Sequence, residues 1–243
     1  MATKLSVNIN KIALIRNSRG ENMPNIVKVA LDCESFGADG ITIHPRPDQR
    51  HAKYDDIHSL KEVLMTELNI EGYPSEELLS HVRRAHPHQL TLVPDPPGVL
   101  TSNAGWKIKD NQEMLKNIIR EMKDLGIRVS LFINPDPIQA AAAAEVGADR
   151  VELYTGPYAK QYSLGDKTII DSYILTATTA LEHGLEINAG HDLNLDNLRF
   201  FKDSIPQLAE VSIGHALVCD ALYFGLENTI KMYKNKIVSG ASV

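Results

Sequence analysis

The chain has 243 residues, of which 43% are hydrophobic, and its 31 acidic and 25 basic residues give a formal net charge of −6. This acidic balance argues against a general nucleic-acid binder or a protein that binds anionic membranes, and no apolar run has the length of a membrane span. The two cysteines, Cys33 and Cys219, are too few for a disulfide framework, so we expect both to be buried thiols. The N-terminus lacks the pattern of a signal peptide, and we expect a cytoplasmic protein.

Short β-rich runs alternate with longer stretches of helical spacing along the chain. The candidate strands are residues 5–10, 40–45, 68–73, 89–94, 128–134, 150–156, 185–191 and 209–215. The helical stretches between them include residues 26–37, 56–68, 75–85, 111–126, 136–147 and 221–235. Strands that alternate with helices pair in parallel, and eight such units in about 250 residues are typical of a closed barrel. The pattern predicts an α/β protein, a (β/α)8 TIM barrel, with residues 1–243 forming a single domain.

A weak internal repeat supports the barrel. "FGADGITIH" at 36–44 and "VGADRVELY" at 146–154 are the same helix end and strand used twice. The main alternative is a doubly wound open sheet, which usually has a Gly-rich phosphate loop after its first strand. Residues 8–20 contain neither a GxGxxG motif nor a P-loop, which favours the barrel.

Polar side chains gather at the predicted C-terminal ends of the strands, where a TIM barrel builds its active site. They are Asn8, Asn10, His44, Glu71, Thr91, Asn134, Glu152, Thr155, Asn188, His191, Ser212 and His215. Three of them, His44, Glu71 and Glu152, interrupt apolar strands, where burial without partners is costly, so we expect them to share a polar cavity. Structural ion pairs are an alternative for the carboxylates. A metal site of His44, Glu71, Glu152 and His191 is another, although no HExxH-type motif is present.

The histidines fall into two groups. His44, His51, His191 and His215 lie at strand ends or in the loops that follow them. The remaining five, on helix faces or in lower loops, are His58, His81, His86, His88 and His183. Imidazole exchanges protons near neutral pH, and burial raises the pKa of a carboxyl group. The first group, with the strand carboxylates, therefore predicts acid–base catalysis.

Basic residues follow several strands on the same side of the predicted barrel. They are Arg16 and Arg19 after the first strand, Arg46 and Arg50 after the second, and Lys107 after the fourth. Guanidinium groups bind phosphate oxygens in fork geometry. A second anion site is indicated in residues 212–220, where a glycine allows close backbone approach just before the last helix. Solvated surface charge is the alternative for each residue; two anion sites would imply two phosphorylated small-molecule substrates, or one bisphosphate.

At these residues the sequence resembles the pyridoxine 5′-phosphate synthase family over essentially its whole length. The segments that carry the resemblance are "VNINKIALIRNSRG", "GADGITIHPRPDQRH", "LNIEGY", "LTLVPDPPGVLTSNAGW", "VSLFI", "AAEVGADRVELYTGPYA", "INAGHDLN" and "SIGHALV". The resemblance implies condensation of 1-deoxy-D-xylulose 5-phosphate with 3-amino-2-oxopropyl phosphate to pyridoxine 5′-phosphate, phosphate and water, without metal or cofactor. It also implies a homo-octamer.

The resemblance assigns roles to individual residues. It implies that His44 and Glu71 accept protons, that His191 donates one, and that Glu152 stabilises charge in the transition state. The residues implied to bind the amino-ketone phosphate are Asn8, Arg19, Asp192, Gly214 and His215. Those implied to bind the deoxyxylulose phosphate are Arg46, His51 and Thr101, with Asn10 and Lys11 at the end of the first strand.

Two positions depart from the family pattern. Many members have Asp-His where this chain has Asn10-Lys11, and the change replaces an acid and an imidazole with an amide and a permanent cation. Some members have Gly where this chain has Asp192, so we expect that position to act through its backbone N–H. Residues 95–106 and 156–166 are candidate lid loops over the site.

Three alternatives in function remain open from the sequence. A phosphosugar isomerase or epimerase would use one phosphate site and an acid–base pair. A Schiff-base aldolase is disfavoured because no lysine lies within a strand, and only Lys11 lies near a strand end. An inactive barrel that binds phosphorylated metabolites is disfavoured by the full set of histidines and glutamates.

Overall fold

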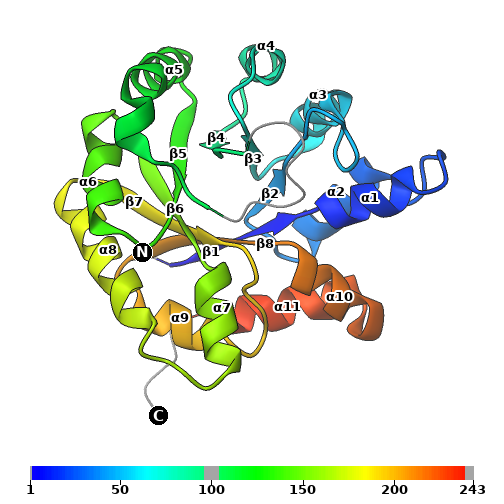
Figure 1. Cartoon of the computed structure of the whole chain (residues 1–243). Helices are drawn as coiled ribbons and strands as arrows, with labels where there is room; N and C mark the ends of the chain where they lie inside the picture. The colour runs from blue at the N-terminus through cyan, green and yellow to red at the C-terminus, as the bar shows by residue number, and fades with distance from the viewer. Residues whose placement is uncertain (1, 96–103, 239–243) are drawn as a thin grey trace.

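The structure, a computed structural model, describes residues 2–95 and 104–238. Thr101, predicted to bind substrate, and most of the candidate lid 95–106 lie outside these residues. Eight parallel strands form a closed barrel in the order β1 to β8, with β1 paired to β8. The strands are β1 (Lys4–Asn8), β2 (Gly40–Ile43), β3 (Glu67–Gly72), β4 (Gln89–Leu92), β5 (Arg128–Ile133), β6 (Arg150–Tyr154), β7 (Glu186–Gly190) and β8 (Leu208–Ile213). Figure 1 shows the strands surrounded by a ring of helices, which confirms the predicted (β/α)8 fold.

The helices of the ring connect successive strands. They are α1 (Asn10–Asn17), α2 (Ile26–Ser35), α3 (Tyr54–Val63), α4 (Glu76–Ala85), the short 3-10 helix η1 (Ile108–Asn111), α5 (Gln112–Asp124), α6 (Pro137–Glu145), α7 (Gly156–Ser163), α8 (Ile170–Glu182), α9 (Leu198–Ser204), α10 (His215–Phe224) and α11 (Leu226–Ile237). Side chains cap several N-termini: Asn25 accepts from the backbone N–H of Lys28, and Ser75 from that of Leu78. These caps help to place the start of α2 and of α4.

Several predicted boundaries were wrong for identifiable reasons. The stretch 221–235 is two helices, α10 and α11, because the backbone at Gly225 has a φ of 75° and leaves the helical region. The stretch 56–68 stops being helical at Val63, since Leu64 is already extended. The first strand ends at Asn8 and is followed by α1. Residues 156–163, predicted as part of a lid loop, form α7.

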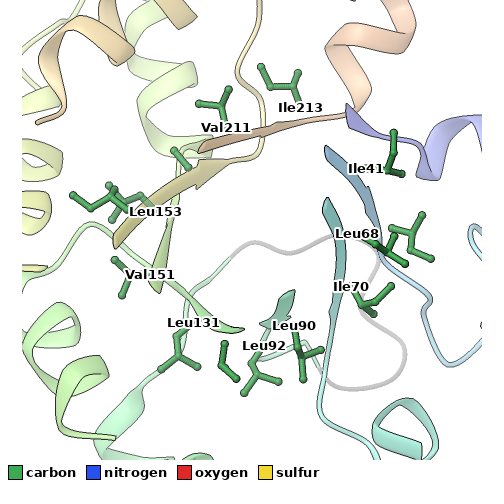
Figure 2. Packing of buried hydrophobic residues seen from close by; sticks show 14 of the residues in the cluster. Ile41, Leu68, Ile70, Leu90, Leu92, Leu131, Val151, Leu153, Val211 and Ile213 are labelled. Carbon is green, nitrogen blue, oxygen red and sulfur yellow. The ribbon is translucent and has the colours of Figure 1, made fainter. Parts of the chain in front are cut away.

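The strands alternate apolar and polar residues, and the two kinds face opposite sides of the barrel wall. Leu68 and Ile70 of β3 are among the buried apolar residues that point toward the surrounding helices (Figure 2). The alternate residues of the strands, most of which are polar, meet inside the barrel. Arg150 on β6 donates to Gln89 on β4 at 3.0 Å, and Ser212 on β8 donates to Glu71 on β3 at 3.4 Å. Because neither pair belongs to adjacent strands, these bonds cross the interior, which is polar.

The N-terminal end of this interior holds a network of paired charges that the sequence did not predict. Glu67 forms ion pairs with both Lys4 and Arg128. Arg150 lies 3.5 Å from Glu210, and both side chains are almost fully buried. Each of these acids therefore has a basic partner inside the barrel.

The two cysteines differ in exposure. Cys33 is buried in α2, as predicted, whereas Cys219 is exposed, so the prediction that it is buried was wrong. Cys219 lies on α10, which also exposes Leu222 and Tyr223. Within residues 2–95 and 104–238, no helix combines the length and the apolar character needed to cross a membrane.

Candidate active site

Glu71 stands at the centre of a group of polar residues from four segments. His44, directly after β2, places Nδ1 3.8 Å from Glu71 Oε2. The side-chain amide of Asn8 on β1 donates to Glu71 Oε2 and the hydroxyl of Ser212 on β8 donates to Oε1, each at 3.4 Å. The structure therefore brings the predicted residues His44, Glu71 and Asn8 together inside the C-terminal end of the barrel.

The surroundings of His44 and Glu71 shift the pKa values of the two groups in opposite directions. Burial raises the pKa of the Glu71 carboxyl to about 7, with the charge of His191 and the hydrogen bond from Ser212 acting against that rise. Burial, together with the positive charges of Arg46 and His51, lowers the pKa of His44 to about 3. At neutral pH, His44 is thus a neutral imidazole, and Glu71 titrates close to neutrality.

Glu152 on β6 is buried in the same interior, and its Oε2 atom has no hydrogen-bond partner among the described residues. Burial, and then the negative charges of Glu71 and Glu210, raise the pKa of Glu152 well above its usual value. Gly190 leaves room for this carboxyl in its present position: a Cβ at position 190 would lie 2.4 Å from Glu152 Oε1. The close approach of Gly190 to this carboxyl was not predicted from the sequence.

His191 and Asp192 follow β7 in a strained turn. Both have positive φ angles, 85° and 60°, which non-glycine residues rarely adopt and which occur often at functional sites. The hydroxyl of Thr155 donates to the carbonyl of Gly190 at 2.7 Å and helps to hold the turn. His191 Nδ1 lies 3.1 Å from Asp192 Oδ2, and the Tyr154 ring contacts the imidazole edge-on with 5.1 Å between ring centroids. The Asp192 side chain therefore orients His191, a role that the sequence did not predict.

Asn10 and Lys11, where the chain departs from the family pattern, begin α1 beside His44. The backbone N–H of His44 donates to Asn10 Oδ1 at 2.9 Å, and that of Asn10 donates to Asn8 Oδ1 at 3.1 Å. Asn10 thus connects the start of α1 to the residue after β2. Burial, followed by the charges of Lys11 and neighbouring arginines, lowers the pKa of His51 to about 4. Substrate contacts of Asn10 and Lys11 remain predictions.

The predicted phosphate-binding arginines have different surroundings. Arg16 is buried and donates two hydrogen bonds to Asp56 of α3, at 2.6 and 2.9 Å, so its guanidinium group fastens α1 to α3. Arg46 lies 3.4 Å from Asp95, a buried residue in the segment that follows β4, and this pairing was not predicted from the sequence. Arg19 is exposed in the turn after α1, outside the hydrogen-bonded group around Glu71.

Gly214 and His215 form the junction between β8 and α10. A Cβ at Gly214 would approach the Asn8 carbonyl oxygen and Cβ to 3.0 Å, so the ends of β8 and β1 pack closely there. His215 is exposed at the first turn of α10, where its Nε2 lies 3.7 Å from Cys219 Sγ. The N-terminus of a ten-residue helix offers free backbone N–H groups to an anion.

The arrangement is suited to proton transfer. Among the described residues, no group of three or more His, Cys, Asp or Glu side chains is placed to hold a metal ion. The structure instead brings together a neutral imidazole, a carboxyl that titrates near pH 7 and a second carboxyl whose pKa is raised. These three side chains can take up and release several protons within the barrel.

Comparisons with known proteins agree with this chemistry. The family described as "Pyridoxal phosphate biosynthesis protein PdxJ" matches residues 5–239. The chain is 56% identical to pyridoxine 5′-phosphate synthase from Bacteroides fragilis over 233 residues, covering 96% of this chain and 98% of the relative. It is also 56% identical over 235 residues to the enzyme of the same name from Cytophaga hutchinsonii, covering 97% and 99% of the two chains.

Solved structures with low sequence identity share the barrel. One is 3-keto-L-gulonate-6-phosphate decarboxylase from Vibrio cholerae, with a TM-score of 0.68, 13% identity and 98% of each chain covered. Another is phosphoribosylanthranilate isomerase from Thermotoga maritima, with a TM-score of 0.58, 13% identity, and 97% of this chain and 98% of that chain covered. These two likenesses show the fold alone. The family match and the full-length relatives show more: the chain belongs to the PdxJ family of pyridoxal phosphate biosynthesis proteins.

Proposed function

We propose that this single-domain enzyme is a pyridoxine 5′-phosphate synthase. It condenses 1-deoxy-D-xylulose 5-phosphate with 3-amino-2-oxopropyl phosphate and releases pyridoxine 5′-phosphate, inorganic phosphate and water. The observation that carries the proposal is the buried group of His44, Glu71 and Glu152 inside the barrel of a chain that is 56% identical to named synthases. As a ring-closing transferase in cofactor biosynthesis, it is assigned to the cytoplasm.

The residues fit the proton transfers that this condensation needs. An amine that adds to a ketone loses a proton, and the departing hydroxyl gains one; ring closure and aromatisation then remove protons from carbon. His44 is neutral at pH 7 and Glu71 titrates near it, so both serve as proton acceptors. His191, oriented by Asp192, serves as the donor, and Glu152 stabilises the charge that develops nearby.

Two sets of residues are assigned to the two phosphorylated substrates. The amino-ketone phosphate is bound by Asn8, Arg19, Asp192, Gly214 and His215. The deoxyxylulose phosphate is bound by Asn10, Lys11, Arg46, His51 and Thr101. Support for the second set comes from the positive charges around His51: after burial, the charges of Lys11, Arg50 and Arg46 lower its pKa. A phosphate dianion placed there would relieve their mutual repulsion.

The test of the activity is an assay with both phosphates, singly and together. We expect pyridoxine 5′-phosphate only when both are present, whereas an isomerase would convert one phosphate alone. We expect Arg46→Gln to raise the KM for the deoxyxylulose phosphate and Arg19→Gln to raise the KM for the amino-ketone phosphate. Arg120→Gln on the outer helix α5 is the control. Native protein without product would refute the activity; unchanged KM values would refute only the assignment of binding residues.

The enzyme is also proposed to form a homo-oligomer, an octamer by family resemblance. Large apolar side chains are exposed on α1 and α10, which pack against each other; they are Leu14, Ile15, Leu222, Tyr223 and Phe224. A contact between copies would remove this apolar surface from water. We expect light scattering to show an octamer. Tyr223→Asp should reduce the mass of the assembly, whereas Leu175→Asp, at an exposed leucine on α8, should leave that mass unchanged. A monomeric native protein would contradict the proposal.

A further inference from the structure

Glu152, Asn188 and Glu210 form a row across three adjacent strands inside the barrel. Glu152 on β6 is the register partner of Asn188 on β7, and Asn188 is the register partner of Glu210 on β8. All three side chains are buried. Side chains of register partners on one face of a sheet are close neighbours. The amide of Asn188 therefore lies between two carboxyl groups.

The nitrogen end of this amide is committed to Glu210. Asn188 Nδ2 donates to Glu210 Oε1 at 3.4 Å, and Glu210 Oε2 lies 3.5 Å from Arg150 Nη1. With Arg150 4% exposed and Glu210 3% exposed, the carboxylate has its charge partner inside the barrel. A fixed carboxylate accepts only from the nitrogen end of an amide, so it determines which way the Asn188 amide points.

The oxygen end of the amide and the neighbouring carboxyl are both unsatisfied. Asn188 Oδ1 and Glu152 Oε2 are buried and have no hydrogen-bond partner among the described residues. An amide oxygen and an ionised carboxyl oxygen can only accept, so they cannot bond to each other. One proton on Glu152 makes it a donor. That proton can satisfy both atoms, directly or through one water, and so remove the cost of two orphaned buried acceptors.

We infer that Asn188 is a positioning residue that holds Glu152 as the neutral acid in the resting enzyme, with Glu210 setting the orientation of the amide. The other groups around Glu152 act in the same direction. Burial is the largest cause of the raised pKa of Glu152, and the negative charges of Glu71 on β3 and Glu210 on β8 raise it further. The neighbours Phe132 on β5 and Gly190 on β7 are uncharged. The consequence for catalysis, which rests on the proposed function, is that Glu152 enters the cycle with an O–H that can donate a hydrogen bond and so stabilise negative charge that develops nearby.

The protonation state can be measured without turnover, so its test is separate from that of the proposed function. In the full chain labelled with carboxyl-¹³C glutamate, infrared spectroscopy resolves the C=O band of a protonated carboxylic acid. We expect native protein at pH 7 to show such a band, part of which is lost in Glu152→Gln. If Glu152→Gln removes no acid band at pH 7, Glu152 is ionised and the inference is overturned.

A double-variant comparison isolates the part played by Asn188. Glu210→Gln frees the amide to turn its N–H toward Glu152 and also removes a negative charge, so the pKa of Glu152 should fall by about one unit, a tenfold change in the protonation equilibrium. In the Asn188→Leu background only the charge effect remains, so the same substitution should cause less than half of that fall. An equal fall in both backgrounds would show that Glu210 acts through space and would overturn the role of Asn188.

Asn69 provides the matched control. It is a buried amide on β3 whose nitrogen donates to Thr42 at 3.3 Å and whose oxygen accepts from Thr91 at 2.9 Å, so both of its ends are satisfied away from Glu152. Asn69→Leu should leave the Glu152 band and its response to Glu210→Gln unchanged. Should Asn188→Leu not fold, Asn188→Ala removes the same amide without adding volume. A change in Asn69→Leu as large as that in the Asn188 variants would also contradict the inference.

Discussion

Glu67 and Glu71 lie four residues apart on β3, inside the same barrel, yet their carboxyl groups behave in opposite ways. Burial alone would raise the pKa of Glu67, but hydrogen bonds from Lys4 and Arg128 lower it to about 2. At Glu71, burial raises the pKa to about 7, because its hydrogen-bond donors are the neutral groups of Asn8 and Ser212. The N-terminal end of the barrel thus pairs its charges for stability, whereas the C-terminal end leaves a carboxyl ready to exchange protons.

Replacing each glutamate by glutamine should separate these two roles most strongly. Glu71→Gln removes a proton acceptor, and we expect kcat to fall about 10²- to 10⁴-fold with little change in fold. The matched variant Glu67→Gln should keep kcat but lower the free energy of unfolding by about 2 kcal/mol, since it loses hydrogen bonds to two cations. Steady-state kinetics and urea unfolding of both variants provide the measurement. Equal loss of kcat in the two variants would contradict the division of roles.

Removing a cation from the paired end should produce the largest loss of stability. Arg150→Leu leaves Glu210 buried without its ion-pair partner, and we expect the free energy of unfolding at pH 7 to fall by about 3 kcal/mol. Without the cation, the pKa of Glu210 in the folded protein rises further, so the deficit should grow from pH 5 to pH 8. Unfolding experiments at both pH values check the size and the direction; a deficit that shrinks as the pH rises would count against this prediction.

His44 should make stability depend on pH in the acid range. Its pKa is lowered from 6.5 to about 3, so below pH 6.5 the unfolded chain takes up a proton that the folded protein does not. Its contribution to stability is therefore lost as the pH falls from 6.5 toward 3, and about 2 kcal/mol should disappear between pH 7 and pH 5. In His44→Gln this loss is absent. Urea unfolding of both proteins at the two pH values gives the difference, and identical pH dependence would refute the burial of a neutral imidazole.

A surface ion pair gives the smallest expected effect and a baseline for the others. Lys28 and Asp32 are one turn apart on α2 with 2.6 Å between Nζ and Oδ2, and the Lys28 side chain is 73% exposed. Lys28→Ala should lower the free energy of unfolding by no more than about 0.5 kcal/mol and leave kcat unchanged. A loss of unfolding free energy as large as that in Arg150→Leu would show that buried and exposed ion pairs contribute equally to stability.

The sequence was sufficient for the fold and for where the reactive side chains collect, because both follow from local patterns. Alternating strands and helices define the barrel, and the position of Glu71 near the end of its strand places it at the site. The pairings could not be predicted, since each depends on residues far apart in the chain. Arg16 pairs with Asp56, forty positions further along the chain. Glu67 pairs with Lys4 and Arg128, which come close to it only when the barrel closes. The break at Gly225 depends on a single backbone angle.

The alternation of apolar and polar residues along most of the strands has a consequence for how this protein can be altered. Leu68, Ile70 and the other side chains that drive collapse lie in the annulus between wall and helices, so the lumen carries little of the hydrophobic driving force. Lumen positions outside the paired charges of Glu67, Arg150 and Glu210 can therefore be exchanged while the outer scaffold continues to specify the barrel. Libraries confined to lumen-facing positions, such as Thr91 and Ser130, should therefore yield folded proteins with new chemistry at high frequency.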